Sequence, residues 1–283
     1  MIPRHELDRI VRHALEEDAP WGDLTSQALI PDEARATATL RAREPGVFAG
    51  GEAFEAAFRL TDPTIAVRGL AADGTAFEAG DALAEVEGPA RAVLTAERVG
   101  LNLAQRMSGI ATLTARFVAE VAGTRARVVD TRKTTPGLRA LERDAVLAGG
   151  GHNHRRSLSD AVLVKDNHLA VLLERGLSVT EALLEARARL PHTTHIEVEV
   201  DRLDQIEAVL AAGIDTIMLD NFSLDDLRAG VAQVAGRALV EASGGVRLDT
   251  VGAIAATGVD LVSVGALTHS ARALDLGLDI RVG

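Results

Sequence analysis

The chain has 283 residues, 47% of them hydrophobic, and a net charge of −11. This length and apolar content are sufficient for one large or two modest domains with a sizeable core. The acidic balance disfavours non-specific nucleic-acid binding, which needs a basic face, and the lack of cysteine excludes disulfides and thiolate chemistry. No apolar run approaches the ~18 residues of a membrane span, and the charged N-terminal stretch does not resemble a signal peptide. We therefore expect a cytoplasmic protein that binds neither nucleic acid nor membrane.

The first part of the chain predicts a helix, a small sheet and a second, longer helix. Residues 3–17 carry apolar side chains at helical spacing. Between residues 34 and 87, short apolar stretches alternate with glycine-containing turns, which is typical of a small antiparallel sheet, and residues 74–88 have the turn spacing of a β-sandwich. Residues 94–123 have a helical apolar period, which the Ser108-Gly109 pair is a candidate to interrupt.

After residue 123, six short apolar runs predict buried parallel strands that alternate with helices. The runs lie in ARVVDTRK, DAVLVKDNH, HIEVEVD, DTIMLDN, RALVEASGG and DLVSVGA. An open doubly wound sheet fits this rhythm, but we favour a (β/α) barrel. Nearly every run ends in a residue that can do chemistry, and barrel active sites lie at the C-terminal ends of several strands. These residues are Arg132, Lys133, Lys165, Glu199, Asp220, Ser243 and Gly265. A seventh and an eighth strand are not evident.

Taken one at a time, these residues also have ordinary explanations. Asp220 precedes a helical pattern, and a carboxylate in that place is often the N-cap of the helix. Lys165 alone could be a strand-end lysine without a role. Glu197 and Glu199 share one face of their strand: facing inward they would be buried and need partners, and facing outward they would be ordinary solvated charges. The three histidines of residues 152–168 lack a convincing zinc spacing, so hydrogen bonding in loops is the better interpretation.

Taken together, these residues predict a cavity for a substrate with several anionic groups. Lys133 and Lys165 are the only lysines among 30 basic residues, which suggests that a compact point charge is needed where a planar guanidinium does not fit. The neighbouring arginines offer planar forks for carboxylate or phosphate. Loops after the last barrel strands often bind phosphate through backbone N–H groups, and residues 243–245 and 265–266 lie where that site is expected.

Six motifs, taken in their order, closely resemble the quinolinate phosphoribosyltransferase family, also called nicotinate-nucleotide pyrophosphorylase (carboxylating). They read DTRKTTPGLR, GGGHNHRRSLSDAVLVKDNH, EVEV, MLDN, EASGG and VGALTHS. The resemblance implies an N-terminal α/β sandwich domain at residues 1–110, an incomplete (β/α) barrel at residues 111–270, and a C-terminal tail at residues 271–283 that packs back on the N-terminal domain. It also implies a homodimer in which the N-terminal domain of one subunit covers the barrel mouth of the other.

The resemblance further implies roles for individual residues. The cationic groups and His154 would bind a dicarboxylate and a diphosphate. Glu199 and Asp220 would hold ribose hydroxyls, directly or through Mg²⁺, and two glycine-containing loops would hold a 5′-phosphate. Arg98 matches an arginine that the family supplies from the partner subunit. The implied catalytic residues are Lys133, Lys165, Glu199 and Asp220, and the implied substrate-binding residues are these four with Arg98, Thr131, Arg132, His154, Arg155, Ser243, Gly244, Gly245, Val264, Gly265 and Ala266.

The implied reaction joins quinolinate to phosphoribosyl pyrophosphate, releases pyrophosphate and carbon dioxide, and gives nicotinate mononucleotide for NAD biosynthesis. Three other functions stay open on the sequence. A Schiff-base lyase would use Lys165 as its nucleophile. A relative with the same fold would act on another pyridine carboxylate. A non-catalytic protein would only bind or sense an anionic metabolite.

Overall fold

A computed structural model describes residues 2–174 and 176–282 of the chain. The chain forms two compact units, each built from segments that are not contiguous in sequence. The first unit holds Met1–Ala115, Thr134–Gly150 and Leu267–Gly283, and the second holds Arg116–Lys133 and Gly151–Ala266. The domains expected from the sequence are continuous, with limits at residues 110 and 270. The structure instead groups residues 134–150 with the first unit.

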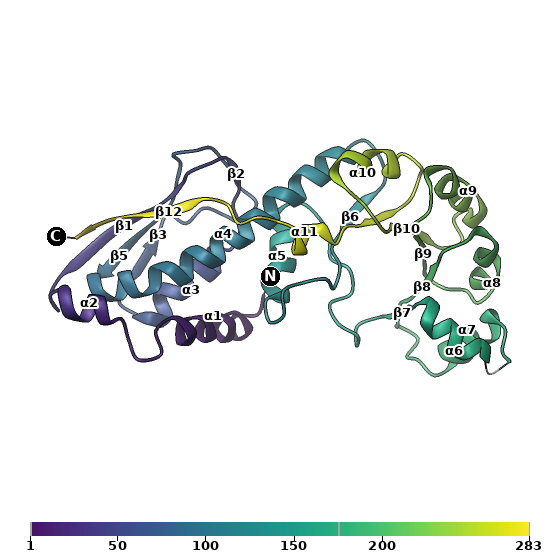
Figure 1. The fold of residues 1–283 in the computed structure, drawn as a ribbon, viewed down its shortest axis with the longest axis horizontal. Coiled ribbons are helices and arrows are strands. Elements are labelled where there is room, and N and C mark those ends of the chain that lie inside the picture. Colours follow the sequence, from purple (N-terminus) through teal and green to yellow (C-terminus); the bar gives the residue numbers. More distant parts are fainter. Residues whose placement is uncertain (1, 175, 283) are drawn as a thin grey trace. The chain divides into compact units, whose positions relative to one another are not determined.

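The first unit is built on a four-stranded antiparallel sheet in the order β12-β1-β5-β3 (Figure 1). Its strands are β1 (Arg35–Ala42), β3 (Ala66–Arg68), β5 (Ala82–Pro89) and β12 (Leu276–Val282). The C-terminal strand β12 pairs with β1 from Ala36, opposite Val282, to Ala42, opposite Leu276. The end of the chain is therefore an integral strand of this sheet.

One face of the sheet carries the core of the first unit. Apolar side chains of the strands pack against those of α3 (Gly51–Thr61) and α4 (Ala90–Glu120). Leu40 of β1 and the two phenylalanines Phe54 and Phe58 of α3 are fully buried in this cluster. The remaining helices of the first unit are α1 (Arg4–Asp18), α2 (Leu24–Leu29), α5 (Arg139–Ala148) and the short α11 (Ala266–His269).

The β-sandwich expected within residues 74–88 does not form. Apart from the main sheet, the described part of this unit contains only one paired set of two-residue strands, β2 (Gly46–Val47) and β4 (Ala76–Phe77). The region expected to hold strands alone also contains α3. Its buried side chains, which include Ala53, Phe54, Ala57 and Phe58, recur with the helical period, and this local pattern was missed.

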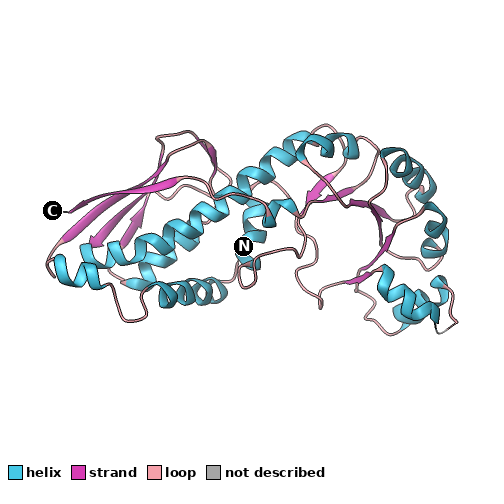
Figure 2. Ribbon diagram, viewed as in Figure 1, coloured by secondary structure: helices cyan, strands magenta, loops and turns pink. Residues whose placement is uncertain are grey.

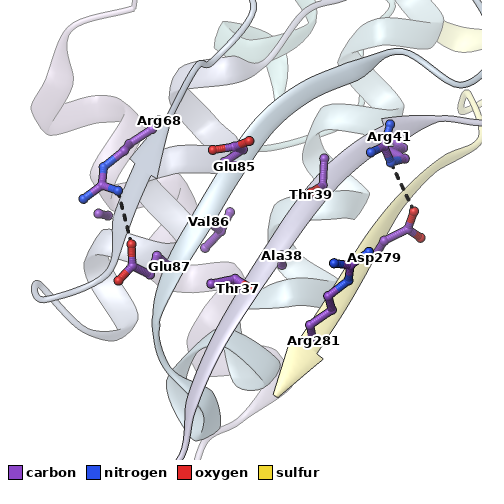
Figure 3. A pocket seen from close by; sticks show the side chains of 11 residues that line it. Thr37, Ala38, Thr39, Arg41, Arg68, Glu85, Val86, Glu87, Asp279 and Arg281 are labelled. Carbon is purple, nitrogen blue, oxygen red and sulfur yellow. Dashed lines mark hydrogen bonds and ion pairs between the residues drawn. The ribbon is translucent and has the colours of Figure 1, made fainter. Parts of the chain in front are cut away.

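The opposite face of the sheet is polar (Figure 3). Side chains alternate along β1, so that Ala36, Ala38 and Leu40 are buried while Thr37 and Thr39 line this outer face. Three arginines and three carboxylates balance one another there, namely Arg41, Arg68, Arg281, Glu85, Glu87 and Asp279. The shallow hollow in this face therefore has no excess of positive charge to attract an anionic ligand.

The long helix α4 is continuous through the Ser108-Gly109 pair, so the interruption considered from the sequence does not occur. Both residues are small because other segments of the first unit approach closely. The Ser108 hydroxyl accepts the Ala49 N–H at 3.1 Å, and a Cβ at Gly109 would lie 1.9 Å from the Arg272 carbonyl oxygen. Although α4 is long, neither it nor any other described helix has an apolar stretch that would span a bilayer.

The second unit contains the six expected strands in one parallel sheet with the order β6-β11-β10-β9-β8-β7. The strands are β6 (Arg127–Val129), β7 (Val162–Val164), β8 (Ile196–Val200), β9 (Thr216–Asp220), β10 (Leu239–Ser243) and β11 (Leu261–Ser263). The intervening helices are α6 (Asp166–Glu174), α7 (Val179–Ala188), α8 (Ile206–Leu210), α9 (Leu224–Val234) and α10 (Leu248–Ala255). Figure 2 shows the sheet curving with these helices on its outer side. No ladder joins β6 to β7 among the described residues, so the barrel is incomplete, as expected.

A buried ion pair ties together four segments of the first unit. Glu142 of α5 has only 1% of its side chain exposed and lies 2.8 Å from a terminal guanidinium nitrogen of Arg106 on α4. The same carboxylate accepts the Thr135 N–H at 3.0 Å and the Thr135 hydroxyl at 2.7 Å. Arg106 also donates to the carbonyl oxygens of Thr268 and Ala271. This network fixes the chain immediately after Lys133 to the core of the first unit.

We expect Glu142→Ala to lower the free energy of unfolding by about 3–5 kcal/mol, because it leaves a half-buried guanidinium and the Thr135 donors without their acceptor. Urea unfolding followed by circular dichroism measures this loss. The control is Glu207→Ala, which breaks an exposed pair with Arg237 and should leave the unfolding midpoint almost unchanged. Equal losses in the two variants would contradict the prediction.

Candidate active site

A cavity of about 590 Å³ lies at the carboxyl ends of the parallel strands, within the second unit. Its volume falls in the range of small-molecule sites. Because all six strands run the same way, residues far apart in the sequence reach the same edge of the sheet. Eleven residues expected in the site line this cavity: Thr131, Arg132, Lys133, His154, Arg155, Lys165, Glu199, Asp220, Ser243, Gly244 and Gly245.

Four expected residues do not line the cavity. Arg98 lies on α4 in the first unit, with its side chain exposed. Val264 is buried, and its N–H donates to the Val129 carbonyl oxygen at 3.0 Å, so its backbone is used to join β11 to β6. Gly265 and Ala266 follow it outside the lining, whereas Ser263, one residue before, takes part in it.

Cations and carboxylates already pair inside the cavity. The Lys165 ammonium lies 2.7 Å from Glu199 Oε2, with the Lys165 side chain 46% exposed and that of Glu199 15% exposed. Burial and the neighbouring charge of Arg132 lower the pKa of Arg155, whose guanidinium also donates to the Ala161 carbonyl oxygen at 3.1 Å. The inward interpretation of Glu199 is therefore the correct one, and its partner is one of the two lysines.

Asp220 does not cap the following helix, although the sequence allowed that interpretation. Ser223 is the N-cap of α9, and its hydroxyl accepts the Asp226 N–H at 3.2 Å. The Asp220 carboxylate instead accepts the side-chain amide of Asn221 at 2.6 Å and faces the cavity. The Asn221 N–H donates to the Ser243 carbonyl oxygen, and this bond holds the end of β9 against the end of β10. Asn221 has a positive φ of 57°.

His154 reaches into the interior of the incomplete barrel rather than bonding within its own loop. Its Nε2 lies 2.9 Å from Glu197 Oε2 and 3.5 Å from Glu241 Oε2, and the two carboxylate side chains are 5% and 1% exposed. The other two histidines of this region are exposed. The Nδ1 of His168 accepts the Lys165 N–H at 3.0 Å, as expected for a loop histidine.

The pKa of His154 and the pKa of Glu197 are both raised, for different reasons. Burial alone would lower the pKa of His154, but its contacts with the negatively charged carboxylates of Glu197 and Glu241 raise it to about 10. Burial raises the pKa of Glu197, as does the charge of Glu241. The Arg155 N–H opposes protonation of the ring, because it donates at 2.8 Å to the Nδ1 lone pair that a second proton would need.

The three ligand atoms of this cluster lie within 4.8 Å of one another, which is close enough to consider a metal ion. A histidine that binds a metal normally donates its other ring N–H to an acceptor. The Nδ1 of His154 instead faces the N–H of Arg155, which is a donor. The arrangement therefore favours an internal polar cluster over a metal centre.

Five residues that line the cavity were missed from the sequence: Leu163, Met218, Asn221, Glu241 and Ser263. Asn221 and Glu241 lie inside motifs that the sequence analysis quoted, MLDN and EASGG. The signal for Glu241 was a carboxylate within an otherwise apolar strand, where burial obliges it to find a partner. It was missed because the sequence prediction chose residues at strand ends, whereas Glu241 lies inside the strand, two residues before its end.

Comparisons with known proteins agree along the whole chain. Residues 23–108 match the family model described as quinolinate phosphoribosyl transferase, N-terminal domain, and residues 110–279 match the C-terminal domain of the same family. A nicotinate-nucleotide pyrophosphorylase (carboxylating) of Mycobacterium leprae is 46% identical, covering 95% of each chain. A probable enzyme of the same name from Bacillus subtilis is 41% identical over 97% of this chain and 93% of the relative. The solved structure of NadC from Streptococcus pyogenes superposes with a TM-score of 0.95 at 39% identity, covering 100% of this chain and 99% of that one.

We expect Gly244→Ala to lower the melting temperature and to distort the cavity. Gly244 has a φ of +92°, and an added Cβ would lie 2.2 Å from Asn221 Oδ1 and 2.9 Å from the Asn221 backbone nitrogen. The neighbouring Gly245, with a φ of +60° and open space around it, is the matched control. Gly245→Ala should cost only about 1 kcal/mol, the usual penalty of a left-handed alanine. Thermal unfolding of both variants checks this, and an equal fall in melting temperature would contradict the clash.

Proposed function

The chain belongs to the quinolinate phosphoribosyltransferase family, and we propose that the cavity at the strand ends of its second unit is where the family's reaction takes place. The enzyme transfers the phosphoribosyl group of phosphoribosyl pyrophosphate to quinolinate, with loss of carbon dioxide. The products are nicotinate mononucleotide and pyrophosphate, in the biosynthesis of NAD. The observation that carries the assignment of the site is the convergence of four cations and three carboxylates on one cavity of an acidic protein.

The cationic side of the cavity suits quinolinate. Two adjacent carboxylates on a rigid ring need cations at fixed positions, and Arg132 and Arg155 offer planar forks for them. Lys165 stands opposite a carboxylate already, at 2.7 Å from Glu199, so an incoming anion would compete with Glu199 for it. Holding the ring in place aligns its nitrogen with the ribose carbon that it attacks, and this alignment replaces a chemical nucleophile.

The carboxylate side suits the phosphoribosyl group. Glu199 and Asp220 would accept hydrogen bonds from ribose hydroxyls, and residues 243–245 would offer backbone N–H groups to the 5′-phosphate. Carboxylates beside the sugar also stabilise the oxocarbenium character of the ribose carbon in the transition state.

Mg²⁺ fits this site as an ion that arrives with the diphosphate. Glu199 and Asp220 are hard oxygen ligands on the cavity wall, but among the described residues they are not part of any close group of three ligand atoms. Mg²⁺ usually keeps several waters and binds through one or two carboxylates plus substrate phosphates, which matches such a pair. When bound, the ion would neutralise charge on the leaving pyrophosphate, and Lys133 and Arg132 would add to that neutralisation.

Decarboxylation then needs little from the protein. Once the ring nitrogen carries the ribose, it is positively charged and stabilises the electron pair that departing carbon dioxide leaves at the adjacent carbon, where a proton then takes up the pair. The protein has to hold the remaining carboxylate and exclude other orientations of the ring, which the cationic groups can do.

The Schiff-base alternative finds less support in the cavity. Such a lysine must lose its proton, which an apolar pocket without a counterion favours. Lys165 instead forms an ion pair with Glu199 and is nearly half exposed.

The direct test incubates the protein with quinolinate, phosphoribosyl pyrophosphate and Mg²⁺ and measures carbon dioxide and nicotinate mononucleotide. A parallel reaction after exhaustive EDTA treatment should lose activity. Full activity in EDTA would refute the metal requirement, and no product in either reaction would refute the proposed function.

We expect Lys133→Ala and Lys165→Ala each to lower kcat more than about 100-fold, because removing one charge that faces the transition state costs roughly 3 kcal/mol. Lys165→Arg should also fail, since a planar fork does not replace a point charge. Steady-state kinetics on folded variants, judged by circular dichroism, provide the measurement. Arg228→Ala, on the exposed surface of α9, is the control and should keep full activity. Near-normal turnover of either alanine variant would remove that lysine from the mechanism.

The proposal includes a homodimer with shared sites. Arg98 is exposed on α4 and does not line the cavity of its own chain. The first unit also exposes three large apolar side chains close together in the sequence, Trp21 at 91%, Leu24 at 78% and Leu29 at 74%. Large apolar side chains left in water are typical of a surface that a partner covers. A second copy of the chain would bury them and bring Arg98 to a quinolinate carboxylate of the neighbouring subunit.

We expect two inactive variants, Arg98→Ala and Lys165→Ala, to restore activity when refolded together. In a mixed dimer one site carries both defects and the other carries neither. Random reassortment makes half the dimers mixed, so about a quarter of wild-type activity should return if sites are independent. The measurement is carbon dioxide release, with the mixed dimer verified by mass. A mixed dimer without activity would mean that Arg98 does not serve the neighbouring site.

A further inference from the structure

We propose that Glu197 and Glu241 are positioning residues for the quinolinate site: they fix the ring of His154, and the ring fixes the turn that carries Arg155. Neither carboxylate was expected in the site from the sequence. The inference rests on the proposed function, because it assigns Arg155 to quinolinate.

The backbone before His154 is attached to the edge strand β6. The His152 N–H donates to the Val128 carbonyl oxygen at 2.9 Å, and the Asp130 N–H donates back to the His152 carbonyl oxygen at 3.0 Å. The His154 N–H then donates to Asp130 Oδ1 at 2.7 Å, and Asp130 is fully buried. The segment therefore follows β6 as a short extension of the sheet up to His154.

The His154 side chain connects this segment to two inner strands of the sheet. Glu197 lies on β8 and Glu241 on β10, and β9 separates these strands in the sheet order. The ring nitrogen contacts both carboxylates, at 2.9 and 3.5 Å. In the described part of the chain no ladder joins the two edge strands of the incomplete barrel, and this polar cluster holds the loop after β6 to the middle of the sheet instead.

The His154 ring in turn fixes the backbone of Arg155. The Arg155 N–H donates to His154 Nδ1 at 2.8 Å, so the peptide between the two residues is fixed relative to the ring. The guanidinium is held at its other end by the Ala161 carbonyl oxygen, at 3.1 Å. A change in the ring position would therefore move the start of the Arg155 side chain, which lines the cavity.

Three of the four oxygens of these two carboxylates lack a hydrogen bond among the described residues. Glu197 Oε1 and both oxygens of Glu241 are buried without a hydrogen-bond partner among the described residues. Buried carboxylate oxygens without hydrogen bonds are costly, and apolar side chains of similar size in such places are often neutral or stabilising. We therefore infer that these two carboxylates serve the function of the cavity rather than the stability of the fold.

The test replaces Glu241 with leucine, which keeps much of the volume and removes both oxygens. We expect Glu241→Leu to keep or raise the melting temperature and to raise the KM for quinolinate by about tenfold or more, the usual loss for one hydrogen bond to a charged group. The KM for phosphoribosyl pyrophosphate should change less than about twofold, because among the described residues the Glu241 oxygens make no hydrogen bond to the loop of residues 243–245 that is expected to hold the 5′-phosphate. Glu197→Gln, which alters the shorter contact, is the second variant if Glu241→Leu does not fold.

Two further variants separate positioning from folding. Asp260→Asn is the matched control: Asp260 is a half-buried carboxylate of the same unit, and it accepts the Val240 N–H at 2.9 Å at the opposite end of the strands. It should lower the melting temperature and leave the quinolinate KM unchanged. The double variant Glu241→Leu/Arg155→Ala should lose no more kcat/KM than Arg155→Ala alone, because Glu241 acts through Arg155.

The measured KM values and binding constants distinguish a failure of this inference from a failure of the proposed function. A quinolinate KM in Glu241→Leu equal to that of the wild type, or losses that add fully in the double variant, would overturn the inference while leaving the proposed function in place. Quinolinate binding by the wild type, measured by calorimetry in EDTA, should match binding without EDTA. A loss in EDTA would mean that a metal holds the cluster and would also overturn the inference. A wild type that forms no nicotinate mononucleotide would instead refute the proposed function.

Discussion

The parallel direction of six strands is the constraint on which the candidate site depends. In a parallel sheet every strand delivers its carboxyl end to the same edge, so residues separated by tens of positions in the chain become neighbours there. The register of the sheet makes this concrete, because Ser243 at the end of β10 lies opposite Asp220 at the end of β9. An antiparallel arrangement of the same runs would send half of these side chains to the opposite edge.

Several charges of the cavity are paired within the protein before any substrate arrives. Lys165 pairs with Glu199, His154 with Glu197 and Glu241, and Asp220 with Asn221. This pairing explains how an acidic protein can gather cations at one edge without severe repulsion. It also suggests how an anionic substrate would bind: a substrate carboxylate would replace Glu199 at Lys165, and a ribose hydroxyl would take up the released Glu199 carboxylate.

Each unit contains one buried polar cluster, and the two clusters differ in how well they are satisfied. In the first unit, Glu142 accepts hydrogen bonds from both Arg106 and Thr135, which is the arrangement of a structural ion pair. In the second unit, Glu241 has no hydrogen bond to either oxygen among the described residues. Incomplete satisfaction of this kind is more typical of functional sites than of structural ones, since proteins accept local cost where activity requires it.

The six strands, their alternation with helices and most of the cations of the cavity could be predicted from the sequence, because strand period and strand-end position are local properties. The sequence also identified the family through its motifs. Which charges pair could not be predicted in this way, because the pairs form between distant parts of the chain. Lys165 and Glu199 are 34 residues apart, and His154 and Glu241 are 87 residues apart, so no local pattern connects them. The structure likewise turned Ser108-Gly109 from a possible helix break into a place of close packing, and it made a strand of the first sheet out of the C-terminal tail, which was expected only to pack back on the N-terminal domain. The physical reason is common to all of these: a side chain's neighbours across a sheet or between helices are set by the fold of the whole unit, whereas its period along the chain is set by its immediate sequence.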